Sequence, residues 1–178
     1  ENCLVRGNLA WDTSNPQNIL GAGLYANGPA AVVNCTFVDN VPGVPDASAG
    51  GIQLGSAEAK VVNCVFFNNG GEAVREFGSD HLDRFDHCAS SVDNDQCDTW
   101  QVIDATAFRG WEKRNEKLGA LTPKTGKPLV GTGTDRAGYA AAGAISSVDL
   151  LGNGRCFGRA LDIGCIESQA GGVMLIVW

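Results

Sequence analysis

The sequence predicts an all-β protein, folded as a right-handed parallel β-helix (solenoid) that ends in a C-terminal cap. Three observations lead to this prediction: a recurring nine-residue motif, abundant turn-forming residues, and no sustained helical pattern of apolar residues in the first 70 positions. The motif reads VVNCTFVDN at residues 32–40 and VVNCVFFNN at residues 61–69. Units repeated at such a period form stacked arrays, in which each unit buries its apolar face against the next.

Further copies extend the motif in both directions. In the copies that begin at Asn2, Asn34 and Asn63, cysteine follows the asparagine and a second asparagine comes six residues later. A weaker copy begins at His87, with Asp93 at that offset. The motif cysteines are 32, 29 and 24 residues apart, which predicts parallel strands lying one over another as successive turns of one coil. An antiparallel sandwich, with chance similarity between two strands, is the alternative.

The motif also predicts where its side chains point. Alternation along a strand places Cys35 and Phe37 on one face, and Cys64 and Phe66 on the equivalent face of the next turn. Small apolar cysteines suit an interior column of free thiols, because parallel Cβ vectors disfavour a disulfide. Asparagine tolerates the left-handed backbone angles of a corner, and stacked amides can bond one another along the axis.

Each unit is expected to hold more than one strand. Short apolar runs, such as residues 23–25 and 51–54, begin 12 and 13 residues before the motif cysteine, and turn-formers such as NGP at 27–29 lie between. Glycine accounts for 24 of 178 residues, which is roughly twice its usual share of about 7%. This composition suits a chain of short strands and tight turns.

Composition and charge limit the classes of function that the chain can have. The net charge of −7 argues against a nucleic-acid partner, which would require a basic stripe. No apolar run approaches the about 20 residues needed to span a bilayer. The length predicts one continuous domain, with β-helix rungs at residues 1–100 and the last rungs plus a capping region at residues 101–178.

The N-terminus begins inside a repeat, at Glu1-Asn2-Cys3, and has no signal peptide. An uncapped first rung exposes apolar surface and open strand edges. The expected partner at this end is therefore a set of upstream β-helix rungs, in a longer protein, or another copy of the chain.

The seven cysteines are an odd number, so at least one is unpaired within the chain. Cys156 and Cys165 lie outside the column and could pair. The spacing of the cysteines includes no CxxC zinc site and does not settle the compartment.

Three blocks after residue 125 resemble the C-terminal end of bacterial parallel β-helix surface proteins, the choice-of-anchor or pectate-lyase-like family. The blocks are Pro128-Leu129-Val130-Gly131-x-Gly133, Asp149-x-x-Gly152-x-x-Arg155 and Asp162-Ile163-Gly164-Cys165-x-Glu167, and Asp104-x-x-x-Phe108 matches the strand that precedes them. Lys127 departs from the serine common in that family, and the tail stops at Trp178 with no long hydrophobic helix. The resemblance implies the C-terminal part of a secreted or cell-surface protein, with an extracellular or cell-surface location.

The charged residues of these blocks are expected to form a structural cap on the last rung. Asp149 and Arg155 flank a glycine-rich turn that a carboxylate–guanidinium pair would pin. Asp162 is expected to hold a backbone amide or the same arginine, and Glu167 completes the set. An active-site Asp/Arg/Glu set is the alternative.

The most acidic window, residues 72–98, holds eight acidic residues against two arginines. The polysaccharide lyases with this fold bind Ca²⁺ between rungs and use a basic residue as proton acceptor. By that resemblance, the catalytic candidates are Arg75, Arg84 and His81, with His87 as a further histidine. The candidate Ca²⁺ ligands, the only cofactor site suggested, are Asp80, Asp83, Asp86, Asp93 and Asp95. A solvated loop without chemistry is the alternative, and the spacing matches no EF-hand.

Three tryptophans are candidates for stacking on sugar rings: Trp11, Trp100 and Trp111. Each falls in an expected connection, where covering the edge of a rung is the alternative role. The leading interpretation is a secreted or cell-surface β-helix module, structural and glycan-contacting, without a clear catalytic centre. The alternatives are the C-terminal portion of a polysaccharide lyase or glycoside hydrolase, and a self-assembling extracellular subunit that stacks end to end.

Overall fold

The computed structural model describes residues 1–10, 21–43, 49–70, 77–78, 82–112, 117–143, 146–155 and 160–168. Within these ranges the chain forms 13 short strands and one α-helix, α1 (Arg136–Ala141). Three short 3₁₀ helices complete the described elements: η2 (Leu82–Arg84), η3 (Ala105–Ala107) and η4 (Leu118–Leu121). The prediction of an all-β chain, poor in helix, is confirmed.

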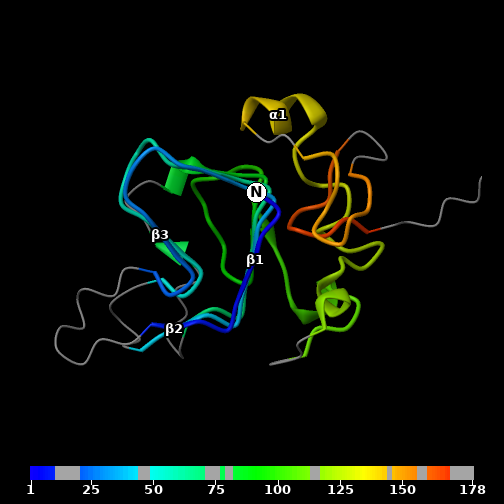
Figure 1. Cartoon of the computed structure of the whole chain (residues 1–178), viewed down its shortest axis with the longest axis horizontal. Helices are drawn as coiled ribbons and strands as arrows, with labels where there is room; N and C mark the ends of the chain where they lie inside the picture. Colours follow the sequence, from blue (N-terminus) through cyan, green and yellow to red (C-terminus); the bar gives the residue numbers. More distant parts are fainter. Residues whose placement is uncertain are drawn as a thin grey trace, which may run out of the picture.

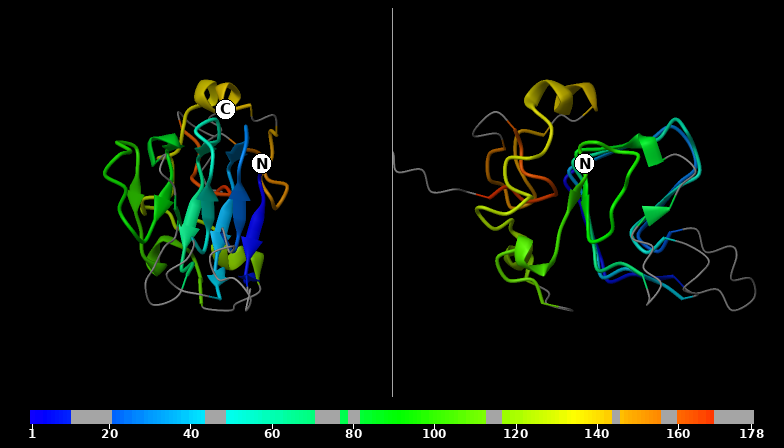
Figure 2. Two further views of the ribbon diagram at one scale, coloured as in Figure 1. Left: turned by 90° about the vertical axis from the view of Figure 1, so that its left-hand side faces the viewer. Right: turned by 180° about the vertical axis from the view of Figure 1, so that it is seen from behind.

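The largest sheet joins the strands that follow the motif cysteines. It contains β1 (Leu4–Arg6), β5 (Thr36–Val38), β9 (Val65–Phe67), β12 (Ala89–Ser90) and β13 (Gln101–Val102), in the order β1-β5-β9-β12-β13. All four pairs are parallel, and Leu4, Thr36, Val65, Ala89 and Gln101 occupy equivalent positions. Figure 2 shows these strands side by side, from blue at the N-terminus to green. The predicted parallel pairing of the cysteine-bearing segments is therefore confirmed.

Three smaller parallel sheets follow the same rule, because each strand pairs with its counterpart in a neighbouring repeat unit. One contains β3 (Leu24–Ala26), β7 (Ile52–Leu54) and β10 (Phe77–Gly78), and the next contains β4 (Ala31–Val33), β8 (Lys60–Val62) and β11 (Phe85–Asp86). The last joins β2 (Leu9–Ala10) and β6 (Val41–Pro42). In Figure 1, β1, β2 and β3 lie on different sides of the blue and cyan part of the chain.

The main core lies between these sheets and contains the motif side chains on their predicted face. Cys35, Phe37, Cys64 and Phe66 are buried there, and the rings of Phe37 and Phe66 stack with centroids 5.1 Å apart. Trp100 lies in the same core, where its ring meets Phe85 edge to face at 5.8 Å. The motif residues thus fill an interior column, and Trp100 covers the core at the β12–β13 end.

The described parts of residues 103–168 pack against the outer face of the five-stranded sheet; we call these parts the lateral segment. The outward side chains Val38, Val65 and Phe67 share a second core with residues such as Leu129 and Ile163. Figures 1 and 2 show this segment, in green to red, beside the sheet that contains β1. Only β13 continues the sheet after residue 100, so the described C-terminal region covers a side of the stack, whereas a cap on its last rung was expected. The physical reason is the apolar outer face of β5 and β9, which requires cover.

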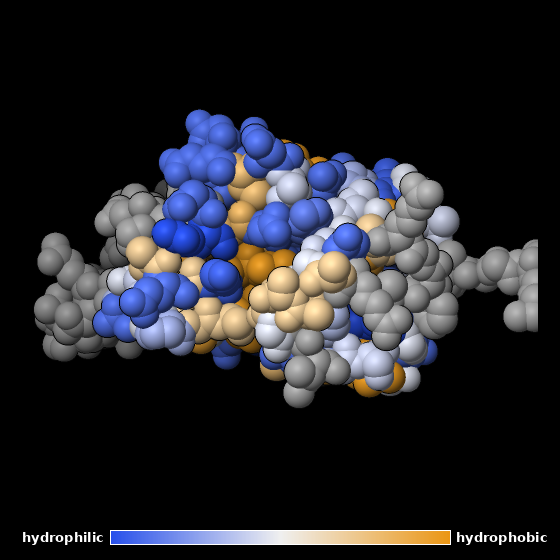
Figure 3. Space-filling model, turned by 90° about the horizontal axis from the view of Figure 1, so that it is seen from above, coloured by the Kyte–Doolittle hydropathy of each residue, from blue (hydrophilic) through white to orange (hydrophobic). Residues whose placement is uncertain are grey.

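Helix α1 extends this cover to a second face. Tyr139 and Ala142 pack on Val33 and Val62, the outward residues of β4 and β8. Figure 3 views the face on which α1 lies, with apolar residues at its centre and hydrophilic residues gathered towards one side.

Candidate functional site

Left-handed backbone angles occur at one corner of four repeat units and at a second corner of the first three. At the first corner, φ is 54° at Asn2, 51° at Asn34, 60° at Asn63 and 47° at His87; at the second it is 66° at Gly7, 59° at Asp39 and 53° at Asn68. Short polar side chains adopt this conformation more readily than branched ones. The corner role predicted for the asparagine before each cysteine is confirmed, and His87 has the same role in the fourth unit.

The second asparagine of each motif forms a ladder of side-chain amides. Asn8 Nδ2 donates to Asn40 Oδ1 at 2.9 Å, and Asn40 Nδ2 donates to Asn69 Oδ1 at 2.8 Å. The backbone N–H groups of Asn8 and Asn40 donate to the same two oxygens, each at 3.1 Å. Asn40 and Asn69 are buried, so these bonds satisfy amides that water cannot reach. The predicted bonding between stacked amides is confirmed at this position.

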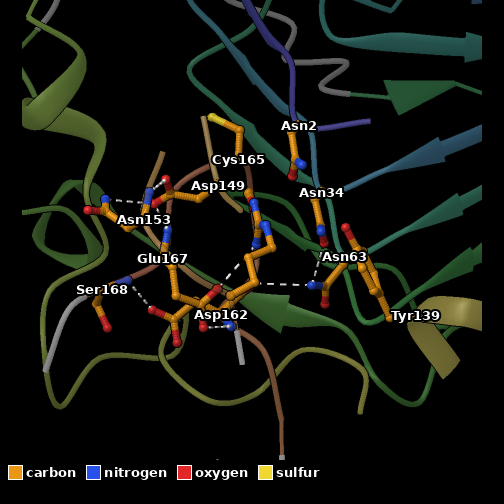
Figure 4. A network of polar contacts seen from close by, with 12 residues as sticks. Asn2, Asn34, Asn63, Tyr139, Asp149, Asn153, Asp162, Cys165, Glu167 and Ser168 are labelled. Carbon is orange, nitrogen blue, oxygen red and sulfur yellow. Dashed lines mark hydrogen bonds and ion pairs between the residues drawn. The ribbon is translucent and has the colours of Figure 1, made fainter. Parts of the chain in front are cut away.

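The lateral segment meets the stack at Asn63, as Figure 4 shows. Asn63 Nδ2 donates to Asn34 Oδ1 at 2.7 Å and to the Asp162 carbonyl at 3.0 Å, while Thr134 N–H donates to Asn63 Oδ1 at 2.9 Å. A Cβ at Gly133 would overlap Asn63 Oδ1, so only glycine allows this approach. The corner asparagine therefore also joins the two parts of the fold.

Four charged side chains form a buried polar cluster behind this junction: Asp149, Arg155, Asp162 and Glu167, all 3–7% exposed. Arg155 Nη1 pairs with Glu167 Oε2 at 3.2 Å, and Arg155 Nη2 donates to the Gly164 carbonyl at 2.9 Å. Asp162 accepts from the backbone N–H groups of Gly131 and Ser168, at 2.8 and 2.6 Å. Figure 4 shows the three carboxylates converging on the backbone of the lateral segment.

The predicted Asp149–Arg155 pair is wrong. Asp149 instead accepts from the backbone N–H groups of Leu151, Asn153 and Glu167, at 2.8, 2.8 and 2.9 Å. The Asp149 carboxylate holds the glycine-rich turn without Arg155. The guanidinium of Arg155 pairs instead with Glu167, which lies 12 residues after it in the sequence. The expected amide-holding role of Asp162 is confirmed.

Acid is expected to weaken this cluster through Asp149. Burial by itself raises the pKa of Asp149, but hydrogen bonds from Glu167, Asn153 and Leu151 outweigh it and leave the pKa below its ordinary 3.8. A lowered folded-state pKa adds stability that is complete above about pH 5 and is lost as the pH falls through the folded pKa. We expect denaturant midpoints to fall more between pH 5 and pH 2.5 in the wild type than in Asp149→Asn. Equal slopes for the two proteins would contradict this assignment.

The candidate catalytic residues are not brought together in the described part of the chain. Arg75 and His81 lie outside the described residues. Arg84 lies beside Asp83, with Nε 3.4 Å from Oδ2, and both side chains are largely exposed. His87 turns its Nδ1 to Asp86 Oδ1, at 2.8 Å. These contacts are those of a polar surface loop.

The candidate Ca²⁺ ligands are also dispersed. Asp80 lies outside the described residues, and Asp83, Asp86, Asp93 and Asp95 are exposed. Asp86 accepts from Thr99 Oγ1 at 2.8 Å, and Asp93 accepts from the backbone of Asn94 at 2.9 Å. Among the residues that the structure describes, no three His, Cys, Asp or Glu side chains are grouped to hold a metal ion.

A sugar-stacking site requires an exposed ring face, and the described tryptophan candidates do not provide one. Trp11 lies outside the described residues. Trp100 is 8% exposed in the main core, with Nε1 donating to the Val92 carbonyl at 2.9 Å, so its proposed glycan contact is wrong. Trp111 is half-buried and packs edge to face on Phe67, with centroids 4.9 Å apart. Trp111 thus covers the outer face of the sheet, which was the alternative role.

The thiols form the free column that the motif predicts. Cys35, Cys64 and Cys88 are free and buried, and Cys3 is free and exposed at the first unit. Cys165 is also a free thiol, and its suggested partner Cys156 lies outside the described residues. Burial raises the pKa of Cys64 well above its ordinary value and that of Cys165 to about 11. These two thiols stay protonated at neutral pH, which disfavours nucleophilic chemistry.

Tyr25 is an exposed aromatic residue that is not among the glycan-stacking candidates predicted from the sequence. It is 38% exposed on β3, between Leu24 and Ala26, which face the core. Gln53 lies beside it on β7, in register. Alternation around Tyr25 was the available signal, because an aromatic residue flanked by two inward-facing apolar residues must point outwards.

Comparison with family models, with curated proteins and with solved structures yields no match. None of the helices in the described ranges has the length and apolar character to cross a membrane. Function must therefore be inferred from the geometry of the chain itself.

Proposed function

We propose that the chain is a structural module: a right-handed parallel β-helix, secreted or at the cell surface, that contacts glycans and has no catalytic centre of its own. The observation that carries this proposal is the shared register of β1, β5, β9, β12 and β13, in which equivalent residues of successive units pair in parallel. Left-handed corners and the amide ladder recur at the same positions. The family that the C-terminal blocks resemble is the basis for the location.

A stack of this kind suits a rigid support. The second and third units each contribute one phenylalanine and one cysteine to the interior, so adjacent units bury one another's apolar surface. Near the junction with the lateral segment, the carboxylates of Asp149, Asp162 and Glu167 accept hydrogen bonds from backbone N–H groups, which engages them in holding turns. Side chains held in this way favour a structural role over proton transfer.

Glycan contact is best supported on the outward face of β3 and β7. The exposed Tyr25 ring has its hydroxyl near Gly55, and Gln53 is its neighbour in register on β7. An aromatic face next to an amide matches the alternating apolar and polar faces of a sugar ring.

Tyr25→Ala is expected to weaken glycan binding by about fivefold to tenfold, because the ring provides the apolar contact. Binding is measured on an array of acidic and neutral polysaccharides, with Val102→Ala, an exposed change on another sheet, as the control. Unchanged binding of Tyr25→Ala would remove this surface from the proposal.

The same polysaccharides test for catalysis. We expect no change in ultraviolet absorbance and no new reducing ends during prolonged incubation. Release of unsaturated uronates, which absorb in the ultraviolet, would favour the polysaccharide lyase alternative, and new reducing ends alone would favour a glycoside hydrolase.

A further inference from the structure

The outer edge of β1 presents unpaired backbone groups in a defined pattern. Thr36 N–H donates to the Cys3 carbonyl, and Gly7 N–H donates to the Val38 carbonyl, so Cys3 and Gly7 point their peptide groups towards β5. Peptide groups alternate along a strand, and those of Leu4 and Arg6 therefore point to the opposite edge. Within the described residues no hydrogen bond reaches these groups.

The amide ladder is also open at this edge. Each ladder oxygen in the interior accepts two bonds from the preceding unit: Asn40 Oδ1 accepts from the N–H and Nδ2 of Asn8, and Asn69 Oδ1 accepts from those of Asn40. Asn8 Oδ1 has no such donor among the described residues. In addition, Asn40 Nδ2 donates to the carbonyl of Val5, in the preceding unit, at 2.9 Å. Among the described residues, Asn8 Nδ2 has no equivalent carbonyl acceptor in a preceding unit.

The unpaired backbone groups of β1 and Asn8 Oδ1 together determine which kind of segment could bind at this edge. A parallel extended strand can satisfy Leu4 and Arg6, and only a residue with both a backbone N–H and a side-chain amide can repeat the two bonds to Asn8 Oδ1. We propose that the edge of β1 binds an extended segment parallel to β1 that carries an asparagine in register with Asn8. The proposal deepens the proposed function and rests on it, because it extends the same register by one unit.

The β13 end of a second copy of the chain fits the β1 edge less well than a repeat-like segment does. β13 is the last strand of the sheet, and Ala105 stands four residues after Gln101, as Asn40 stands four residues after Thr36. Alanine has no side-chain amide to donate to Asn8 Oδ1. Trp100 also occupies the core at that end, where a stacked unit would place its own interior residues. The ladder therefore favours a repeat-like segment over end-to-end stacking of identical chains.

The test uses the full chain and a synthetic peptide of residues 31–40, AVVNCTFVDN, with Cys35→Ala to prevent disulfide exchange. Amide hydrogen exchange and chemical shifts are followed by NMR. We expect saturable binding that slows exchange at Leu4 and Arg6 by about tenfold or more and shifts the Asn8 side-chain amide. The same peptide with Asn40→Ala is expected to bind about threefold to tenfold more weakly, because the side-chain bond to Asn8 Oδ1 is lost while the backbone N–H of residue 40 remains. A peptide N-methylated at Phe37 and Asp39 should not bind, since those N–H groups would pair with β1.

The outcomes separate this proposal from the one on which it rests. If Thr36 and Val65 exchange freely in the protein alone, the paired stack itself is wrong. If they are protected but the peptide does not bind, or binds equally well when N-methylated, the docking proposal alone is overturned. A dimer that protects Leu4 and Arg6 without peptide, seen by sedimentation, would also overturn it, because the occupant would then be a second copy.

Discussion

Replacing Phe66 by alanine is expected to lower the free energy of unfolding by about 3–5 kcal/mol. The Phe66 side chain is fully buried, and its ring lies 5.1 Å from that of Phe37 and 5.9 Å from that of Phe85. Its removal leaves a cavity between two adjacent units, and the stacked backbones on either side are hydrogen-bonded and cannot collapse into it. Denaturant unfolding of the purified chain measures the loss.

The matched control for this substitution is Val102→Ala, which removes an apolar side chain that is 55% exposed at the end of the same sheet. We expect its effect to stay within about 0.5 kcal/mol. If Phe66→Ala does not fold, Phe66→Leu serves instead, with an expected loss between those of the other two. Similar stability of Phe66→Ala and Val102→Ala would contradict the position of Phe66 in an interior column.

Asn40→Ala is expected to cost about 2–4 kcal/mol, because it removes the central member of the amide ladder. The change leaves the N–H and Nδ2 of Asn8 without their acceptor and the Val5 carbonyl without its side-chain donor. Asn69 Oδ1, which is buried, loses the side-chain donor of Asn40 and keeps its backbone N–H donor. The stability difference is measured by denaturant unfolding at neutral pH.

Asn8→Ala is the matched control, since it deletes the same side chain at the exposed end of the ladder. Water can replace the lost partners there, and we expect a cost below about 1 kcal/mol. Equal losses at Asn8 and Asn40 would show that the ladder contributes no more in the interior than at its end.

Much of the stack could be predicted because its signals are local and repeated. An asparagine before the motif cysteine marks a left-handed corner, alternation in the motif assigns Phe37 and Phe66 to the interior, and recurrence of the motif every 24–32 residues predicts the parallel pairing. Tyr25 was missed although the same alternation points it outwards, because its strand has no cysteine motif to draw attention to it.

The contacts of the lateral segment could not be predicted in the same way. Asn63 and Asp162 are 99 residues apart, and Thr36 and Cys165 are 129 residues apart, yet both pairs are hydrogen-bonded. The sequence places Arg155 six residues after Asp149, but backbone N–H groups that gather around Asp149 only in the folded chain leave the arginine to pair with Glu167. Sequence distance is a poor guide to such choices, because partners compete for each carboxylate in three dimensions.

The strand-rich character, the parallel pairing of the cysteine-bearing units and the corner and ladder roles of asparagine are predictable, since each depends on a residue's own conformational preference and on repetition. Folding in three dimensions is needed to show that the described C-terminal region covers the side of the sheet, that Trp100 belongs to the core, and which groups satisfy the buried charges. The reason is that burial of the apolar outer face of β5 and β9 is non-directional and can be achieved by any apolar segment, so the segment that does it is selected by the whole fold.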